Sequence, residues 1–251
     1  MTEFFAAVME LPGTWQFWVA VVATAVAGMM RGYSGFGTAI LLSPVYSTLF
    51  GTLGGVPVIL LMELIVSMQL LPKAIGEADR RTILPLGAAA VIATPFGAWV
   101  LLNADGEILR RAIGICVLLF GALLMSSWRY HGSRPLLLNL SVGVTSGLLK
   151  GATGMSGPPV ILYLLSGPEA ARQHRASLIL FFSMISVISI AAPLWAGLMG
   201  PVLLAKVALL LPVLAIFVPV GVRLFHILPI AWYRRCAQLL LALAGGFALL
   251  F

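Results

Sequence analysis

Gly28-Met29-Met30-Arg31-Gly32-Tyr33-Ser34-Gly35-Phe36-Gly37 places one arginine among four glycines, between two long apolar runs. A related stretch follows 119 residues later: Gly147-Leu148-Leu149-Lys150-Gly151-Ala152-Thr153-Gly154-Met155-Ser156. We call them the first motif (28–37) and the second motif (147–156). Three glycines align, Lys150 replaces Arg31, and Thr153 replaces Ser34. A cation and a hydroxyl in a glycine frame are kept twice, which marks these stretches as the working part of the molecule.

The sequence around the motifs has the composition of a membrane protein. Of its 251 residues 61% are hydrophobic and 9% are charged, whereas soluble domains have about 25% charged residues. Apolar runs long enough to form membrane helices recur along the chain, so we expect an all-α polytopic membrane protein. The ten predicted segments are 15–30, 33–50, 54–72, 82–102, 108–128, 136–149, 152–167, 176–197, 202–222 and 231–251.

The similarity between the two halves extends beyond the motifs. Pro95-x-Gly97 matches Pro219-x-Gly221, and Arg110-Arg111 matches Arg234-Arg235, both at an offset of 124. The chain therefore divides into two repeats, 1–128 and 129–251, with about five segments each. Because five is odd, the second repeat must enter the membrane upside down. This inverted-topology repeat is common among secondary transporters.

Charged loops predict the orientation. Ten Lys and Arg residues fall in the loops 73–81, 129–135, 168–175 and 223–235, which alternation places on one side. Near the other side are only Arg110, Arg111 and Lys206. By the positive-inside rule the first side is cytoplasmic, and both termini are extracytoplasmic.

The segments that flank each motif are short for full crossings, which leaves two arrangements open. If both members of a pair cross completely, the motif lies at a membrane surface; if they form a re-entrant hairpin, it lies near the midplane. We favour re-entrant hairpins whose glycine-rich tips meet near the centre. Non-helical backbone is tolerated there when protein or a water-filled cavity covers it, and glycine allows close approach.

The motifs carry the groups that bind a small anion. A helix that starts just after each tip would point its free amides and positive dipole at the tip, while Arg31 and Lys150 add full charges. Glu63 is the only carboxylate deep inside a segment, so we expect it to act in proton coupling or as a counter-ion. The predicted substrate-binding residues are Arg31, Gly32, Ser34, Gly35, Lys150, Gly151, Thr153, Gly154 and Ser156.

Other functions are disfavoured. The net charge of +7 lies mostly in loops and reflects topology, so we expect no nucleic-acid partner. Cys116 and Cys236 lack metal-ligand spacing, and we expect no metal and no cofactor. Gly154-Met155-Ser156-Gly157 has the G-x-S-G form of intramembrane serine proteases, which need a histidine base in a helix; all three histidines lie in predicted loops, so we expect no enzyme and no catalytic residue. The sequence does not indicate whether the protein is a monomer or a homo-oligomer.

The residues 31–38 (R-G-Y-S-G-F-G-T) and 150–160 (K-G-A-T-G-M-S-G-P-P-V) resemble the motifs of the sulfite exporter TauE/SafE family. The arrangement of two related hydrophobic halves is also similar, so the resemblance covers essentially the full length. It implies a permease of the bacterial cytoplasmic membrane for sulfur-containing oxyanions or organosulfur acids, such as sulfite or sulfoacetate.

Motifs and resemblance together predict a secondary transporter that exports a small sulfur oxyanion or sulfonate. We expect alternating access coupled to the proton gradient, with the substrate held between the two tips. A passive anion channel and an uptake carrier for another small organic anion are the alternatives.

Overall fold

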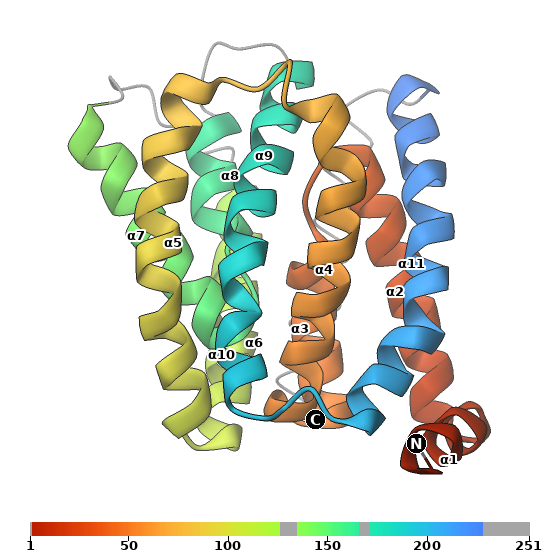
Figure 1. The fold of residues 1–251 in the computed structure, drawn as a ribbon. Coiled ribbons are helices and arrows are strands. Elements are labelled where there is room, and N and C mark those ends of the chain that lie inside the picture. Colours follow the sequence, from red (N-terminus) through yellow and green to blue (C-terminus); the bar gives the residue numbers. More distant parts are fainter. Residues whose placement is uncertain (1, 126–134, 166–170, 228–251) are drawn as a thin grey trace.

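The computed structural model describes residues 2–125, 135–165 and 171–227, and these residues form helices and no strand. The predicted segment 231–251 and the predicted boundary between the halves lie outside the described residues. In chain order (Figure 1) the helices are α1 (Thr2–Glu10), η1 (Leu11–Gly13), α2 (Trp15–Ser34), α3 (Thr38–Phe50), α4 (Thr52–Ala74), α5 (Arg80–Asn103), α6 (Gly106–Met125), α7 (Leu136–Thr153), α8 (Gly157–Leu165), α9 (Ala171–Ser189), α10 (Ala191–Trp195) and α11 (Pro201–Ile227).

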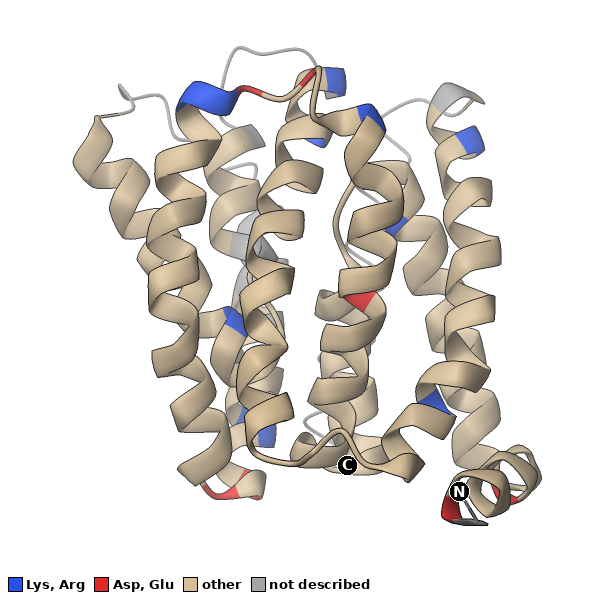
Figure 2. Cartoon of the chain, viewed as in Figure 1, with Lys and Arg blue, Asp and Glu red and all other residues tan. Residues whose placement is uncertain are grey.

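The described helices make this a membrane protein. Five stretches are long and apolar enough to cross a bilayer: Trp15–Ser34, Thr52–Ala74, Arg80–Asn103, Arg172–Trp195 and Pro201–Phe225. Charged positions gather at the two ends of the bundle, and few lie between them (Figure 2). We call the end with loop 75–79 the upper end and the end with residues 104–105 the lower end, as in Figure 1.

Tryptophans mark the membrane boundary at the lower end. Trp15 and Trp18 lie at the start of α2, Trp99 near the end of α5, and Trp195 at the end of α10. All four side chains are more than half exposed. Tryptophan is enriched where the hydrocarbon core meets the headgroups, and these four residues place that level at the lower end.

Each motif contains the turn of a helical hairpin, where one helix ends and the next begins. Helix α2 ends at Gly35, whose φ of +81° is left-handed, and α7 ends in the same way at Gly154, with φ +77°. In both, the glycine N–H bonds the carbonyl of the motif cation at 2.9 Å, Arg31 in α2 and Lys150 in α7. We call residues 35–37 the first tip and 154–156 the second tip. As the sequence predicts, a helix starts after each tip: α3 at Thr38 and α8 at Gly157.

The two hairpins enter the bundle from opposite ends (Figure 1). The α2–α3 hairpin starts and finishes at the lower end, whereas α7 descends from the upper end and α8 returns toward it. The arms are unequal, because α2 has 20 residues and α3 has 13. The first arm is long enough to cross a bilayer and the second arm is shorter, and the position of the first motif near the midplane stays a prediction.

Helices α2 and α11 cross where their backbones lack side chains. A Cβ atom added to Gly32 would lie 2.0 Å from the carbonyl oxygen of Val218. One added to Gly221 would lie 2.0 Å from the carbonyl oxygen of Met29. Only glycine permits so close an approach, and small residues are used in this way where membrane helices cross.

Helices α7 and α5 cross in the same manner. A Cβ atom on Gly151 would lie 2.1 Å from the carbonyl oxygen of Thr94, and one on Gly97 would lie 2.1 Å from that of Leu148. Each residue of this crossing corresponds to one in the α2–α11 crossing at an offset of 119 or 124, the offsets that relate the sequence motifs. The two crossings therefore use equivalent residues.

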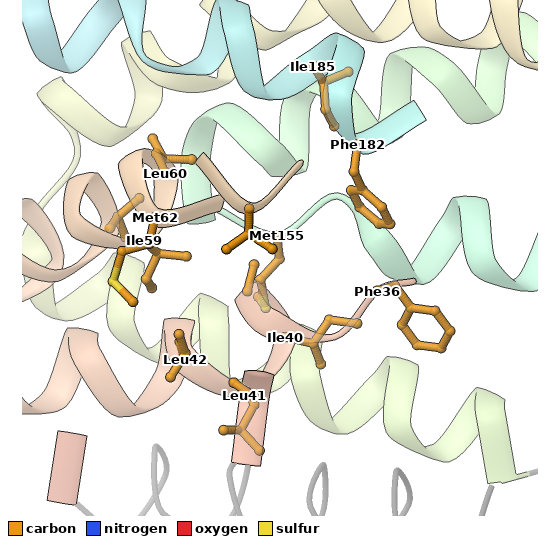
Figure 3. Packing of buried hydrophobic residues seen from close by; sticks show 14 of the residues in the cluster. Phe36, Ile40, Leu41, Leu42, Ile59, Leu60, Met62, Met155, Phe182 and Ile185 are labelled. Carbon is orange, nitrogen blue, oxygen red and sulfur yellow. The ribbon is translucent and has the colours of Figure 1, made fainter. Parts of the chain in front are cut away.

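An apolar core surrounds the tips. Figure 3 shows Phe36 and Ile40 from the first tip and the start of α3, Met155 from the second tip, Ile59 from α4 and Phe182 from α9. Each is at most 4% exposed. These side chains are buried and apolar, so charges placed among them interact strongly.

Two of the three histidines that the sequence places in loops lie in helices. His174 was expected in a loop, but it lies in α9 and is buried, since α9 begins at Ala171 and takes up the end of the predicted loop 168–175. His226, predicted in loop 223–235, lies in the last turn of α11, because α11 continues to Ile227. His131 lies outside the described residues.

Candidate functional site

Arg31 is a fully buried cation with free hydrogen-bond donors. It sits in the last turn of α2, and its Nη2 donates to Ser67 Oγ on α4 at 2.7 Å. Its guanidinium carbon lies 4.8 Å from the ring centre of Phe182 on α9. Among the residues that the structure describes, Nε and Nη1 have no hydrogen-bond partner. Arginine stays charged in proteins and buried polar groups are normally satisfied, so these atoms are suited to hold an anion.

Lys150 is equally buried, but it is paired. It lies in the last turn of α7, and its Nζ donates to the Glu63 carboxylate of α4 and to the carbonyl of Gly154, the latter at 3.2 Å. The hydroxyl of Thr38, the first residue of α3, donates to the other carboxylate oxygen at 2.6 Å. This ion pair therefore links the second motif to α4 and to the helix that follows the first tip.

Glu63 lies halfway along α4, in the middle of the bundle. It is 2% exposed, and it also interacts electrostatically with Arg31. A buried carboxylate is tolerated only with compensating charge and hydrogen bonds, which Lys150 and Thr38 supply. Glu63 therefore connects the two motif cations: it contacts Lys150 directly and attracts Arg31 electrostatically.

The aligned hydroxyls serve the backbone of the tips. Ser34 Oγ lies 2.7 Å from the carbonyl of Met30 and accepts from the N–H of Phe36 at 3.2 Å. Thr153 Oγ1 donates to the carbonyl of Leu149 at 2.7 Å and accepts from the N–H of Met155 at 3.2 Å. These bonds close the helix ends where the chain leaves the helical path. Repetition of a hydroxyl in both motifs thus reflects repeated tip geometry.

Ser156 in the second tip differs from these two. Its side chain is 1% exposed, and its Oγ has no hydrogen-bond partner within the described part of the chain. The neighbouring carbonyl of Thr153 accepts from Ser43 of α3 at 2.5 Å, which fixes the second tip against α3. Of the three predicted hydroxyls, Ser156 is the one available to a ligand.

The predicted glycines divide into two roles. Gly35 and Gly154 supply the left-handed backbone at the tips, whereas Gly32 and Gly151 lie inside helices and permit the two crossings. All nine predicted binding residues are buried, and Glu63 with them. Arg31 and Lys150 belong to the ends of helices, so the cations precede the tips.

Three contacts of the site carried no clear sequence signal. Ser67 and Phe182 lie in apolar segments where serine and phenylalanine are ordinary packing residues, yet both touch Arg31. Thr38 directly follows the first motif, but its bond to Glu63 requires the three-dimensional fold.

Arg175 and Arg172 connect α9 to other helices at the upper end. Arg175 Nη2 donates to the carbonyl of Gly32 at 2.8 Å, and its guanidinium carbon lies 5.3 Å from the ring centre of Phe225 on α11. Arg172 forms an exposed salt bridge with Glu77 in loop 75–79. The hydrogen bonds from Arg172 lower the pKa of Glu77, because they favour its charged form. These contacts join the start of α9 to the first motif and to the α4–α5 loop.

A bundle of helices long and apolar enough to cross a membrane, with buried cations at its centre, defines the class as a polytopic membrane protein. The sulfite exporter TauE/SafE family model matches residues 20–248. The chain belongs to this family.

A curated relative agrees over a shorter stretch. The chain is similar to the probable sulfite/organosulfonate exporter TauE of Cupriavidus necator, with 33% identity over 81 residues. That stretch covers 32% of each chain, about a third of the relative's length. No solved structure matches the chain.

Proposed function

We propose that this protein is a secondary transporter that exports a small sulfur-containing oxyanion or sulfonate, such as sulfite or sulfoacetate, across the bacterial cytoplasmic membrane. Family membership supports the substrate class. The observation that carries the proposal is the buried guanidinium of Arg31, whose Nε and Nη1 are unpartnered among the described residues. An uncompensated charge is expensive in an apolar core, and a bound anion removes that expense.

Alternating access between two inverted repeats is the proposed mechanism, with repeats 1–128 and 129–251. Two features support it: hairpins that enter from opposite ends, and helix crossings that use equivalent residues in α2–α11 and α7–α5. In such transporters one bundle rocks against another around a fixed site near the midplane. The substrate would lie beside Arg31, between the tips, with Ser156 and the tip amides as further donors.

Proton coupling would act through Glu63. Its carboxylate holds Lys150 and receives a hydrogen bond from Thr38 of the α3 N-terminus. A proton on Glu63 would release the charge of Lys150 to the substrate. In this scheme the upper end faces the cytoplasm and both termini lie outside, in line with the loop charges.

Sulfite flux in proteoliposomes tests the proposal. Wild-type protein should show saturable flux that a pH gradient drives uphill, and Arg31→Met should reduce it about 30-fold or more, because losing one buried charged partner costs about 2–5 kcal/mol. Glu77→Gln is the control, since it removes an exposed carboxylate far from the motifs in sequence. Full activity of folded Arg31→Met would refute the proposal, and flux that a pH gradient never drives uphill would indicate a channel instead.

A further inference from the structure

The ionisable groups of the site carry unequal numbers of positive and negative charges. Arg31 and Lys150 are cations and Glu63 is a carboxylate, and all three are buried. Lys150 and Glu63 are in direct contact and cancel each other. Within the described part of the chain, the guanidinium of Arg31 contacts the neutral Ser67 hydroxyl and the Phe182 ring and forms no ion pair, although Glu63 also attracts it electrostatically. The buried site therefore has one uncompensated positive charge.

Charged residues near the upper end do not change the net charge of the buried site. Arg175 also interacts electrostatically with Arg31, but it is half-buried. Its guanidinium contacts the Gly32 carbonyl and the Phe225 ring, while its Nε has no hydrogen-bond partner among the described residues. Water screens charges near the surface much more than charges in an apolar core. The balance between Arg31, Lys150 and Glu63 thus dominates the energy of a bound ion.

We infer that the site binds a singly charged anion at Arg31, and that Glu63 sets this limit by cancelling Lys150. The inference rests on the proposed function and specifies its substrate class. A sulfonate with one charge, or hydrogensulfite, leaves the buried site neutral. A doubly charged anion leaves one negative charge in an apolar core, which is strongly unfavourable.

The charges of the site also indicate how the Lys150–Glu63 ion pair limits the charge of the bound anion. When Glu63 is neutral, Lys150 becomes a second free cation and the site can balance two negative charges. Doubly charged sulfite or sulfoacetate would then bind only together with a proton on Glu63. Glu63 is accordingly a specificity-determining residue, and Arg31 is the residue that holds the anion.

Two probes with fixed charge test the inference. Methanesulfonate carries one negative charge and methanedisulfonate carries two at every pH near neutrality. Their radiolabelled uptake would be measured in proteoliposomes at constant pH. Wild-type protein should prefer methanesulfonate at least about tenfold, which corresponds to about 1.4 kcal/mol. In Glu63→Gln that ratio should fall at least about tenfold, whereas Glu77→Gln should leave it unchanged.

A second variant separates charge from misfolding. Glu63→Gln combined with Lys150→Gln restores the net charge of the wild-type site, so it should restore the preference for methanesulfonate. Equal transport of both probes by the wild type would overturn the inference and leave the proposed function standing. An unchanged ratio of methanesulfonate to methanedisulfonate transport in folded Glu63→Gln would also overturn the inference. Folded wild type that transports no sulfonate and no sulfite would overturn both.

Discussion

Arg31 and Lys150 occupy the same position in the two motifs, but they have different partners. Arg31 faces a hydroxyl and an aromatic ring, whereas Lys150 faces a carboxylate. The sequence predicts two cations at the tips, and it predicts Glu63 either as a proton-coupling group or as a counter-ion to one of them. It could not indicate which one, because the pairing depends on where the fold places α4, whose Ser67 reaches Arg31 and whose Glu63 reaches Lys150.

Removing one member of the ion pair should destabilise the protein strongly. Lys150→Met leaves Glu63 buried without its cation, and we expect a loss of about 3–5 kcal/mol in the free energy of unfolding. Lys150→Met combined with Glu63→Gln should recover most of it, because no buried charge is left unpaired. Thermal unfolding in detergent measures both proteins. Additive losses in the double variant would show that the two side chains do not interact.

At the scale of helices, the glycines of the crossings are more restrictive than those of the tips. Gly151→Ala places a methyl group 2.1 Å from the Thr94 carbonyl oxygen, and backbone cannot move aside as a flexible side chain can. We expect a loss of about 1–3 kcal/mol or more in unfolding free energy. Gly54→Ala is the matched control in α4, since the nearest atom to its Cβ is 3.7 Å away. Equal stability of the two variants would contradict the crossing geometry.

The helix boundaries show what apolar runs can predict. The predicted first segment ends at residue 30, before the charged Arg31, whereas α2 continues to Ser34. A membrane helix can carry a cation when the surrounding helices bury it, and hydropathy alone does not detect such burial. The start of the helix after the second tip has a local signal, because Pro158 and Pro159 suit the first turn of a helix.

At the scale of the whole molecule, the division into two inverted repeats stays a prediction from matched residues at offsets of 119 and 124. The equivalent crossings of α2–α11 and α7–α5 were not predictable, since a sequence offset does not tell which helices touch. The orientation in the membrane stays a prediction from loop charges, because helix packing is the same either way up.

Cysteine labelling tests the orientation. In a variant without Cys116 and Cys236, Asp105→Cys at the lower end should react with a membrane-impermeant maleimide in intact cells. Gly76→Cys at the upper end should react only after permeabilisation, because the loops rich in arginine face the cytoplasm. The opposite labelling pattern would invert the assignment and place both termini inside.

The position of a bound sulfonate is the most direct test of the account. A structure of the protein with bromomethanesulfonate would locate the ligand from the anomalous signal of bromine. We predict sulfonate oxygens within hydrogen-bond distance of Nε or Nη1 of Arg31, with the Lys150–Glu63 contact intact. An ordered sulfonate elsewhere in the bundle, with those Arg31 atoms still unpartnered, would contradict the central claim that Arg31 holds the transported anion.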